Sequence, residues 1–184
     1  MKRCAWVGED PLMIRYHDEE WGVPVHDDRR LFEYLILDGF QAGLSWRIVL
    51  HKREALREAL DGFDPEKIAA YDEEDVESRM SNPGIIRNRQ KLRAAVRNAR
   101  AYLSFREKHG SLAAFLWDIH GPVRKNAFTR EEEIPATTPA AERISRVLKR
   151  AGFSFVGPTI TYALLQAAGF VNDHLVSCFR YSEV

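Results

Sequence analysis

Cysteine is scarce in this sequence of 184 residues, where Cys4 and Cys178 are the only two and stand near opposite ends of the chain. Small secreted domains that depend on disulfides contain many more cysteines, so a disulfide-rich scaffold is excluded. Two isolated cysteines fit the reducing cytoplasm, where such residues are more often metal ligands or inert side chains.

Long hydrophobic runs are also missing. The longest, Leu112–Trp117, has six residues, whereas a membrane-spanning helix needs about 20. No apolar stretch follows the basic start of the chain, Met1–Cys4, so we expect no signal peptide. With 45% hydrophobic and 29% charged residues, the chain can bury a large core, and we expect one globular domain over residues 1–184.

The net charge is zero, with 27 acidic and 27 basic side chains, whereas proteins that bind nucleic acids usually carry a basic excess. The charges are nevertheless segregated. Residues 61–79 contain eight acidic and two basic residues, and residues 87–108 contain eight basic residues and one acidic residue. Because a local face attracts phosphate, this pattern leaves polyanion binding open, beside the alternative of an ordinary solvated helix face.

Alternating β-branched residues are nearly absent and helical periodicity dominates, which predicts an all-α fold. Leu92, Val96, Ala99 and Leu103 recur at helical spacing, so residues 88–108 are predicted to form one long amphipathic helix. Further helices are expected within residues 31–41, 44–60, 67–80 and 111–119, and residues 121–137 form the least regular stretch.

Two more helices are expected near the C-terminus. Thr138-Pro139 is a favourable helix start, with Thr as N-cap and Pro at the first helical position, and Gly152 is placed to end that helix. Its buried face should hold Ile144, Val147, Leu148 and Ala151. The second helix should run from Pro158 to about Gly169.

The segment between these two helices has the pattern of a helix-hairpin-helix element, which binds DNA. Gly152 and Gly157 stand at its two bends, where glycine permits tight turns and close approach of another molecule. Backbone N–H groups at the start of the second helix, around Thr159, can hold a phosphate oxygen without reading sequence. The alternative is a simple turn between helices with two packing phenylalanines.

The two ends of the chain offer a candidate metal site made of Cys4, His17, His174 and Cys178. His174 and Cys178 are four residues apart, which predicts that they lie one turn apart on the same face of a helix. Two Cys and two His are the composition of a closed zinc site, which would join residues 4–17 to 174–178 and leave no open position for catalysis. The alternative is two small buried cysteines and two solvated histidines.

Three of the four tryptophans, Trp6, Trp21 and Trp46, lie in the first quarter of the chain. With Tyr16 and Asp38 they provide aromatic planes and hydrogen-bonding groups. This combination suits a pocket for a flat heterocycle. The alternative is that the tryptophans belong to the core.

Six stretches occur in the order in which one known family has them. They are Arg3–Trp6, Tyr16–Pro24, Gln41–Trp46, Gly84–Arg87, Phe153–Gly157 and Gln166–His174. On these motifs, which cover essentially the whole chain, the sequence resembles the bacterial DNA-3-methyladenine glycosylase I family. The resemblance implies an all-α helix-hairpin-helix bundle, with the hairpin element at about 138–169 and one structural zinc ion (Zn2+) joining the termini.

The same resemblance implies the activity. Such an enzyme flips N3-methyladenine out of alkylated double-stranded DNA and hydrolyses its glycosidic bond, leaving an abasic site. The methylated base is cationic and leaves as a neutral molecule, so the protein mainly has to flip, select and hold it. The resemblance also implies a monomer in the bacterial cytoplasm, which binds DNA and does not associate with a membrane.

Individual site residues follow from the resemblance, position by position. Trp46 would stack on the flipped base, Tyr16 and Asp38 would hydrogen-bond it, and Trp6 and Trp21 would line the surroundings. The other implied positions contact DNA or bind zinc: Gly43 and Leu44, which fill the gap in the base stack, the hairpin residues Gly152, Gly157 and Thr159, and the ligands Cys4, His17, His174 and Cys178.

Three positions depart from the usual family pattern. Asp38 stands where Glu is common, Phe40 replaces a Gln and Met13 replaces an aromatic residue. Asp38 remains the carboxylate expected to act in recognition and catalysis, whereas Asp173 is expected to support His174, with a catalytic role as its alternative. The rival functions are a DNA-damage binder without activity, its pocket altered at these three positions, and a zinc hydrolase, which needs an open metal position.

Overall fold

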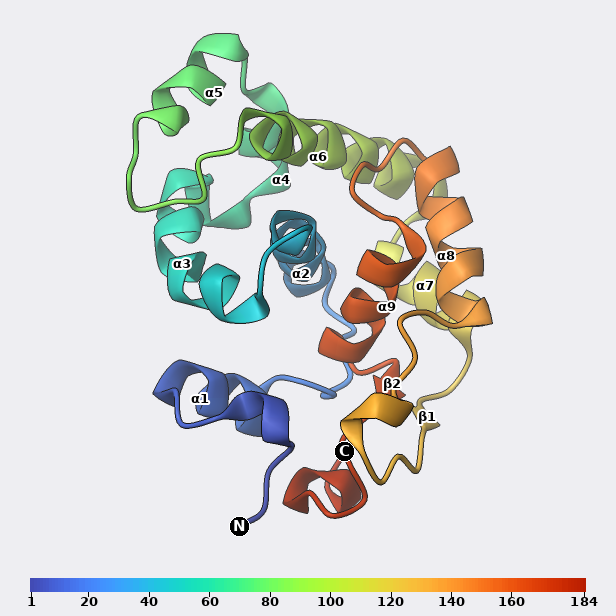
Figure 1. Ribbon diagram of the computed structural model, residues 1–184. Helices are drawn as coiled ribbons and strands as arrows, with labels where there is room; N and C mark the ends of the chain where they lie inside the picture. Colours follow the sequence, from blue (N-terminus) through green and yellow to red (C-terminus); the bar gives the residue numbers. More distant parts are fainter.

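The computed structural model describes residues 1–184 and confirms an all-α fold (Figure 1). The α-helices are α1 (Pro11–Glu19), α2 (Asp28–Gln41), α3 (Trp46–Ala59), α4 (Pro65–Ala70), α5 (Glu73–Met80), α6 (Arg89–His109), α7 (Leu112–His120), α8 (Pro139–Arg150) and α9 (Pro158–Ala167). The short 3-10 helices are η1 (Ala5–Val7), η2 (Asp61–Phe63), η3 (Glu131–Glu133) and η4 (Phe179–Ser182). None of the helices has the length and apolar character that crossing a membrane requires.

Side-chain caps fix where the helices begin. Thr138 caps α8 by accepting a hydrogen bond from the Ala141 N–H, Pro139 occupies the first turn, and Gly152 follows the helix with a φ of 94°, as the sequence predicts. The sequence-based prediction missed α1, although Asp10 caps it and Pro11 opens it in the same way.

Helix α2 forms the centre of the molecule, and α3, α6, α7 and α9 pack against it (Figure 1). Residues 31–40 of α2 are all buried, so this part of the helix is covered on every side and carries Glu33 and Asp38 into the interior. On α8, Ile144 and Leu148 are buried as predicted, whereas Val147 and Ala151 are only partly covered because they face the groove beside α6 and α7.

The segregated charges pair with each other. The acidic residues Glu66, Glu73 and Glu77, which belong to α4 and α5, form ion pairs with basic residues of α6. Their partners are Arg106, Arg93 and Arg89, in that order. Three of the eight basic residues of segment 87–108 are therefore paired with acidic side chains, so this segment is not a face of unpaired positive charge.

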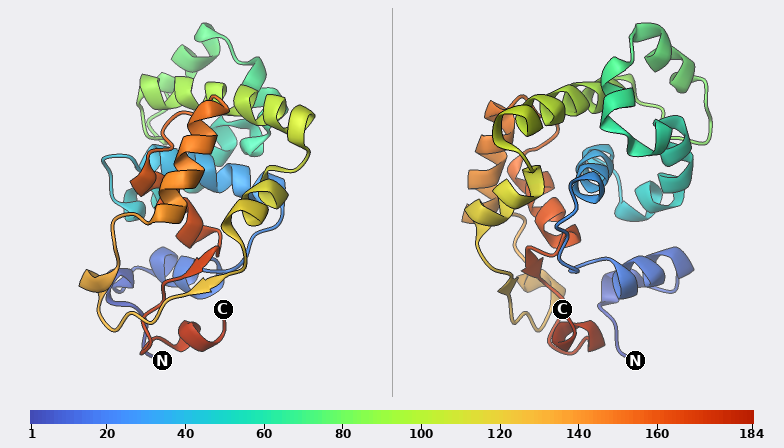
Figure 2. Two further views of the ribbon diagram at one scale, coloured as in Figure 1. Left: turned by 90° about the vertical axis from the view of Figure 1, so that its right-hand side faces the viewer. Right: turned by 180° about the vertical axis from the view of Figure 1, so that it is seen from behind.

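The two ends of the chain lie next to each other (Figure 2). The Phe179 N–H donates to the Lys2 carbonyl at 3.0 Å, and strand β1 (Arg124–Lys125) pairs in parallel with β2 (Val171–Asn172). Gly169 lets the end of α9 approach the incoming chain, because a Cβ there would stand 2.3 Å from the Val23 carbonyl carbon. The irregular stretch expected at 121–137 contains only β1 and η3.

Candidate functional site

The structure brings the predicted aromatic residues together around one cavity of about 210 Å³. Helices α1, α2, α3 and α9 and the N-terminal 3-10 helix η1 contribute to its walls. The lining residues are Trp6, Tyr16, Trp21, Asp38, Gln41, Trp46, Ile134, Ala163 and Gln166. The aromatic rings therefore come from several elements and meet only in the folded chain.

The rings form walls of a slot. The ring centroids of Tyr16 and Trp46 are 5.0 Å apart, with an interplanar angle of 45°. Trp6 meets Trp21 edge to face at 5.1 Å and Tyr16 at 6.5 Å. Aromatic pairs in such arrangements are favourable in themselves, so the slot is largely formed before any ligand enters.

Two polar atoms in this cavity have no hydrogen-bond partner. They are Oδ2 of Asp38 and Nε1 of Trp46, and both are fully buried. Native proteins pair nearly all buried polar atoms, so a free acceptor and a free donor in one slot indicate a ligand with complementary groups. Asp38 is 2% exposed, and burial raises the pKa of its carboxyl well above the usual range.

Tyr16 faces the same slot from α1. Burial, with Asp38 nearby, raises the pKa of its phenol well above the usual value, so the hydroxyl keeps its proton and remains able to donate a hydrogen bond. Gln166 lines the slot from α9 and donates from Nε2 to Asp173 at 2.8 Å. The sequence-based prediction did not assign a role to Gln166.

Lys91 holds the loop that connects α2 to α3. Lys91 is a buried residue, 7% exposed. Its ammonium group donates to the carbonyls of Phe40 at 2.8 Å and Ala42 at 2.6 Å. A cation at the C-terminal end of a helix satisfies its last carbonyls and opposes its dipole. Beyond this anchor Gly43 has a φ of 75°, and Leu44, two residues before Trp46, is 36% exposed.

The hairpin between α8 and α9 is bound to α6. Asn98 accepts from the Ser154 N–H at 2.7 Å and donates to the Ser154 carbonyl at 3.0 Å. The left-handed turns are at Gly152 and Phe155, with φ of 94° and 55°, whereas Gly157 has a φ of −62°. The prediction that glycine serves a tight turn at both bends is therefore wrong at Gly157, because any residue can adopt that backbone.

Gly157 keeps the N-terminus of α9 accessible. A Cβ at this position would meet no atom within 4 Å, and α9 begins without a side-chain cap. The first N–H groups of a helix need an outside partner when no side chain caps them. Thr159 lies exposed in this first turn.

The four candidate metal ligands converge at the joined termini. Nε2 of His17 lies 3.2 Å from Nδ1 of His174 and 3.4 Å from Sγ of Cys178. Nδ1 of His174 lies 3.7 Å from Sγ of Cys178 and 3.9 Å from Sγ of Cys4. All four residues are buried, and their ligand atoms all lie within 4.8 Å of one another.

This geometry fits a tetrahedral ion. With metal–sulfur bonds of about 2.3 Å and metal–nitrogen bonds of about 2.0–2.1 Å, the ligand atoms of such a site stand about 3.3–3.8 Å apart. Each histidine also directs its other ring nitrogen to a hydrogen-bond partner. His17 uses Asp18 at 2.7 Å, and His174 uses the Trp21 carbonyl at 3.0 Å, which is how metal-binding histidines are usually oriented.

Two predictions about this region are wrong. His174 and Cys178 do not share a helix face, because pairing of β2 with β1 extends the chain before them and they lie in the turn that leads to η4. Asp173 does not support His174. It accepts instead from Tyr162, from Gln166 and, at 2.7 Å, from Nδ2 of Asn126.

The three departures from the family pattern are not equivalent. Asp38 lines the slot, whereas Met13 and Phe40 belong to the hydrophobic core and do not line it. Met13 is 5% exposed and Phe40 is 1% exposed. A pocket altered at all three positions, as the rival function of an inactive DNA binder requires, is therefore not what the structure has.

Comparison with known proteins points to one family. The sequence profile described as methyladenine glycosylase matches residues 6–181. DNA-3-methyladenine glycosylase 1 of Escherichia coli strain K12 is 50% identical over 183 residues, which cover 98% of this chain and 97% of the relative. DNA-3-methyladenine glycosylase of Haemophilus influenzae is 45% identical over 178 residues, 96% of each chain.

Solved structures agree over the whole fold. A crystal structure of a 3-methyladenine DNA glycosylase I superposes with a TM-score of 0.95 at 49% identity, and the match covers 97% of this chain and 98% of that one. The Staphylococcus aureus 3-methyladenine DNA glycosylase I, studied for its recognition of 3-methyladenine, gives 0.92 at 36% identity over 97% and 96% of the chains. Since sequence and fold both match from end to end, this chain belongs to the methyladenine glycosylase family.

Proposed function

We propose that this protein removes N3-methyladenine from alkylated double-stranded DNA by hydrolysis, as a base-excision repair enzyme. The observation that carries the proposal is the aromatic slot in which Asp38 Oδ2 and Trp46 Nε1 both lack partners. The relatives of this chain are named for the same activity, and the S. aureus enzyme was studied for recognition of this base.

The reaction needs little acid–base chemistry from the protein. Water adds to C1′ of the sugar, and the electron pair of the C1′–N9 bond passes to the base. Because N3-methyladenine carries a positive charge in DNA, it leaves as a neutral molecule without first being protonated, and the proton of the water passes to solvent. The protein therefore has to extrude the base, distinguish it from adenine and hold it.

Recognition of the base depends on three side chains with different roles, those of Asp38, Trp46 and Tyr16. The carboxylate of Asp38 attracts the cationic base and accepts a hydrogen bond from its edge, and the cation favours the ionised form of the buried carboxyl. Trp46 stacks on the base, and its face also attracts a cation. The protonated hydroxyl of Tyr16 donates to an acceptor on the base. Trp6, whose ring lies next to that of Tyr16, and Trp21 line a further part of the slot.

The DNA contacts lie at the rim of the slot and at the hairpin. Leu44 projects from the loop held by Lys91 and fills the gap that the extruded base leaves, while Gly43 allows the loop to turn. The uncapped N-terminus of α9, at Gly157 and Thr159, binds a phosphate of the same duplex. Gly152 shapes the hairpin, and none of these contacts reads sequence.

A zinc ion held by Cys4, His17, His174 and Cys178 has a structural role. Two thiolates and two imidazoles fill all four tetrahedral positions, so water has no place on the metal, unlike in a zinc hydrolase. Burial raises the pKa of the Cys4 thiol to about 12, and a bound cation would stabilise the thiolate that burial disfavours. We expect one zinc ion per chain and a monomeric protein.

A base-release assay tests the proposal. Purified protein is incubated with duplex DNA methylated at N3 of adenine, and the products are separated by chromatography, with unmethylated duplex as control. Free 3-methyladenine and abasic sites are expected from the methylated duplex alone. Binding to the methylated duplex without base release would instead establish the rival DNA-damage binder.

A further inference from the structure

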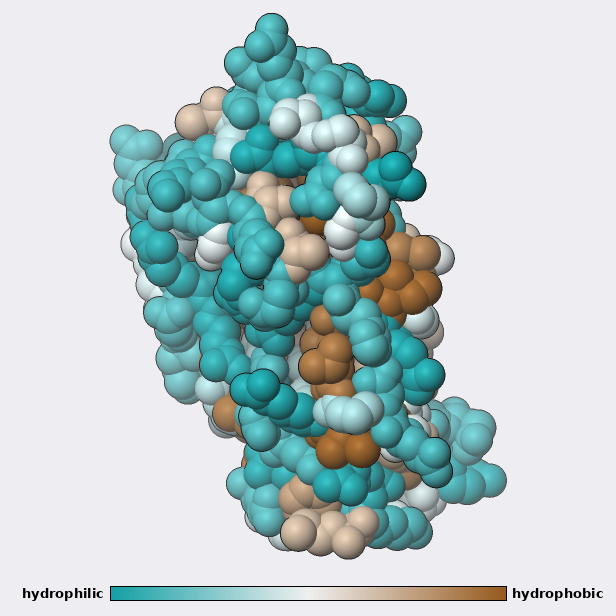
Figure 3. Space-filling model, turned by 90° about the vertical axis from the view of Figure 1, so that its left-hand side faces the viewer, coloured by the Kyte–Doolittle hydropathy of each residue, from teal (hydrophilic) through white to brown (hydrophobic).

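A second and larger cavity, of about 810 Å³, lies between α1, α2 and α3 and shares Tyr16 with the base slot. From the side of the molecule on which α1 and α3 lie, the surface is mostly hydrophilic, with a few hydrophobic side chains near its middle (Figure 3). Charged residues dominate the lining of this cavity. Five of them form ion pairs across it, namely Glu20, Arg30, Glu33, Arg53 and Arg57.

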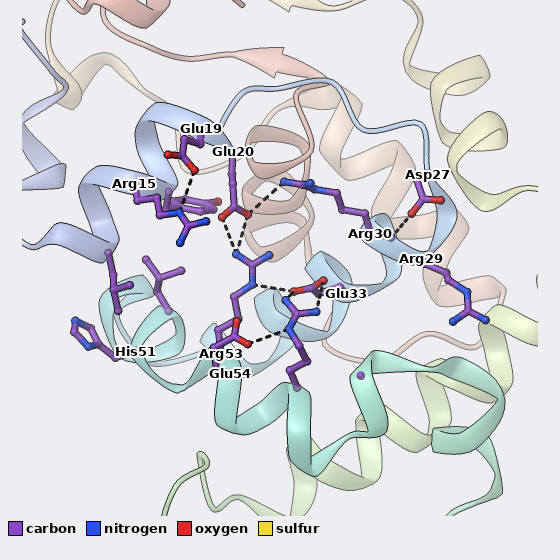
Figure 4. Close-up of a pocket in the computed structure, with 15 residues that line it drawn as sticks. Arg15, Glu19, Glu20, Asp27, Arg29, Arg30, Glu33, His51, Arg53 and Glu54 are labelled. Atoms are coloured by element: carbon purple, nitrogen blue, oxygen red, sulfur yellow. Dashed lines mark hydrogen bonds and ion pairs between the residues drawn. The ribbon is translucent and has the colours of Figure 1, made fainter.

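Arg53 of α3 stands at the centre of these ion pairs (Figure 4). Its Nη1 donates to both carboxylate oxygens of Glu20, at 2.9 and 2.8 Å, and its Nε donates to Oε1 of Glu33 at 2.8 Å. Glu20 directly follows α1 as its C-cap residue, and Glu33 lies within α2. One guanidinium group therefore connects three helices.

The connection is well shielded from water. The side chain of Arg53 is 12% exposed, and those of Glu20 and Glu33 are 18% and 11% exposed. Burial lowers the pKa of Arg53, but Glu33 and Glu20 raise it more, so the guanidinium stays charged. Without Arg53, Glu33 would keep only Arg57, and Glu20 would keep only Arg30 at 3.5 Å and the Tyr34 hydroxyl. Neither remaining cation joins α1 to α3, so the arrangement is sensitive to the loss of Arg53.

Each of the three helices also supplies one wall of the base slot. Tyr16 precedes Glu20 by one turn of α1, and Trp46 precedes Arg53 by two turns of α3, so each pair lies on one face of its helix. Asp38 lies further along α2 than Glu33. The relative positions of the three recognition side chains thus depend on the relative positions of the helices that Arg53 connects.

We propose that Arg53 is a positioning residue for base recognition, which sets the spacing of Tyr16, Asp38 and Trp46 by holding α1 and α2 against α3. The inference rests on the proposed function. Displacement of recognition groups by about 1 Å can reduce activity about a hundredfold, so a connection behind the slot can control what happens inside it.

The test compares Arg53→Met with Arg57→Met. Arg57 donates to both oxygens of Glu33 but contacts nothing on α1, so its loss removes a similar ion pair and keeps the connection of α1 to α3. For both variants and the original protein, we would measure binding of free 3-methyladenine, affinity for undamaged duplex, single-turnover excision, and the NMR signal of the Trp46 indole N–H.

For Arg53→Met we expect loss of base binding and of the single-turnover rate by about 10- to 100-fold, a shifted Trp46 signal, and unchanged affinity for undamaged duplex. Arg57→Met should stay close to the original protein in all four measurements. If Arg53→Met binds and excises normally, or if both variants lose base binding equally at equal stability, the inference is wrong.

Two further observations keep the outcomes separate. If the original protein neither binds nor releases 3-methyladenine, the proposed function fails and not only this inference. Should Arg53→Met not fold, Glu20→Gln replaces it as the test. This variant keeps an acceptor for the Tyr34 hydroxyl and removes the negative charge with which Arg53 pairs. It should weaken base binding and shift the Trp46 signal, and normal binding by this folded variant would overturn the inference.

Discussion

At the scale of single residues, Asp38 presents a conflict between stability and function. A carboxyl group that is 2% exposed and has one oxygen without a partner is destabilising in the free protein. The same free oxygen lies in the slot that Trp46 also lines, where the proposed function needs an acceptor for a cationic base. A site that is complementary to its ligand before binding must carry such unpaired groups, and here they are one acceptor and one donor.

Asp38→Asn keeps the shape of the side chain and removes its charge. We expect excision of 3-methyladenine to fall by about 10- to 1000-fold, equivalent to about 1.4–4 kcal/mol of transition-state stabilisation. Asp38→Glu restores the residue common in the family and should be tolerated. Trp46→Ala should be worse than either, because the base loses its stacking surface. Single-turnover release from methylated duplex at saturating enzyme measures all three, and an unaltered rate for Asp38→Asn would remove Asp38 from recognition.

The same substitution should stabilise the ligand-free protein, increasingly so at higher pH. Burial raises the pKa of Asp38 in the folded state, so the folded protein retains a proton that the unfolded chain releases above about pH 4. This contribution to stability is complete below the unfolded pKa and is lost as the pH rises towards the folded pKa.

Urea unfolding of the original protein and Asp38→Asn between pH 4 and pH 8 measures the effect. The difference in free energy of unfolding should grow with pH, to about 1–3 kcal/mol in favour of the variant. A difference that stays constant over this range would contradict the raised pKa.

At the scale of elements, different residues of the hairpin between α8 and α9 fix its conformation and border its exposed end. Gly152 and Asn98 set its conformation, while Gly157 adopts a backbone open to any residue and faces empty space. The absence of a side chain at Gly157 therefore serves no internal packing. The proposed phosphate contact would account for a small residue here, because a side chain at Gly157 would stand beside the N–H groups at the start of α9.

Gly157→Val should fold normally and bind DNA poorly. Its melting temperature should remain within a few degrees of the original, since a Cβ at this position meets no atom within 4 Å and the backbone has a φ of −62°. Affinity should fall equally for duplexes of different sequence, because a phosphate contact carries no sequence information. Fluorescence anisotropy with several unrelated duplexes checks this, and a loss confined to some sequences would exclude a pure phosphate contact.

At the scale of the whole molecule, the two ends of the chain are held together by only a few contacts. Backbone pairing is limited to two residues in each of β1 and β2, and the cluster of Cys4, His17, His174 and Cys178 lies beside it. Trp21 connects this cluster to the base slot, because it lines the slot while its carbonyl accepts from His174. Loss of the metal should therefore reach the slot as well as the termini.

Cys178→Ser should release the metal and lower stability by several kcal/mol, because the free energy of binding a structural metal is part of the free energy of folding. Metal content by elemental analysis and the melting temperature are the two measurements. Ser177→Ala, an adjacent substitution outside the cluster, serves as control. Retention of one zinc ion per chain, or its loss without a change in melting temperature, would show that the site is misassigned.

Most of the helices, α1 excepted, and the family could be predicted from the amino-acid sequence alone. Periodicity and caps predicted α6, α8 and α9 nearly to the residue, because a helix is specified by neighbours three and four positions apart. Six motifs in order identified the family, which the comparisons confirm. The sequence also supplied the members of the aromatic group and of the metal cluster, because their residue types are chemically distinctive.

How these residues come together, and which charged groups pair with one another, could be seen only in the folded molecule. Lys91 and Arg53 look like ordinary surface cations in the sequence, yet one holds the end of α2 and the other joins α1, α2 and α3. Within the basic segment 87–108, Arg89, Arg93 and Arg106 pair with acidic residues of α4 and α5, which the sequence alone did not show. These outcomes depend on contacts between residues far apart in the chain, and a local pattern carries no information about such contacts.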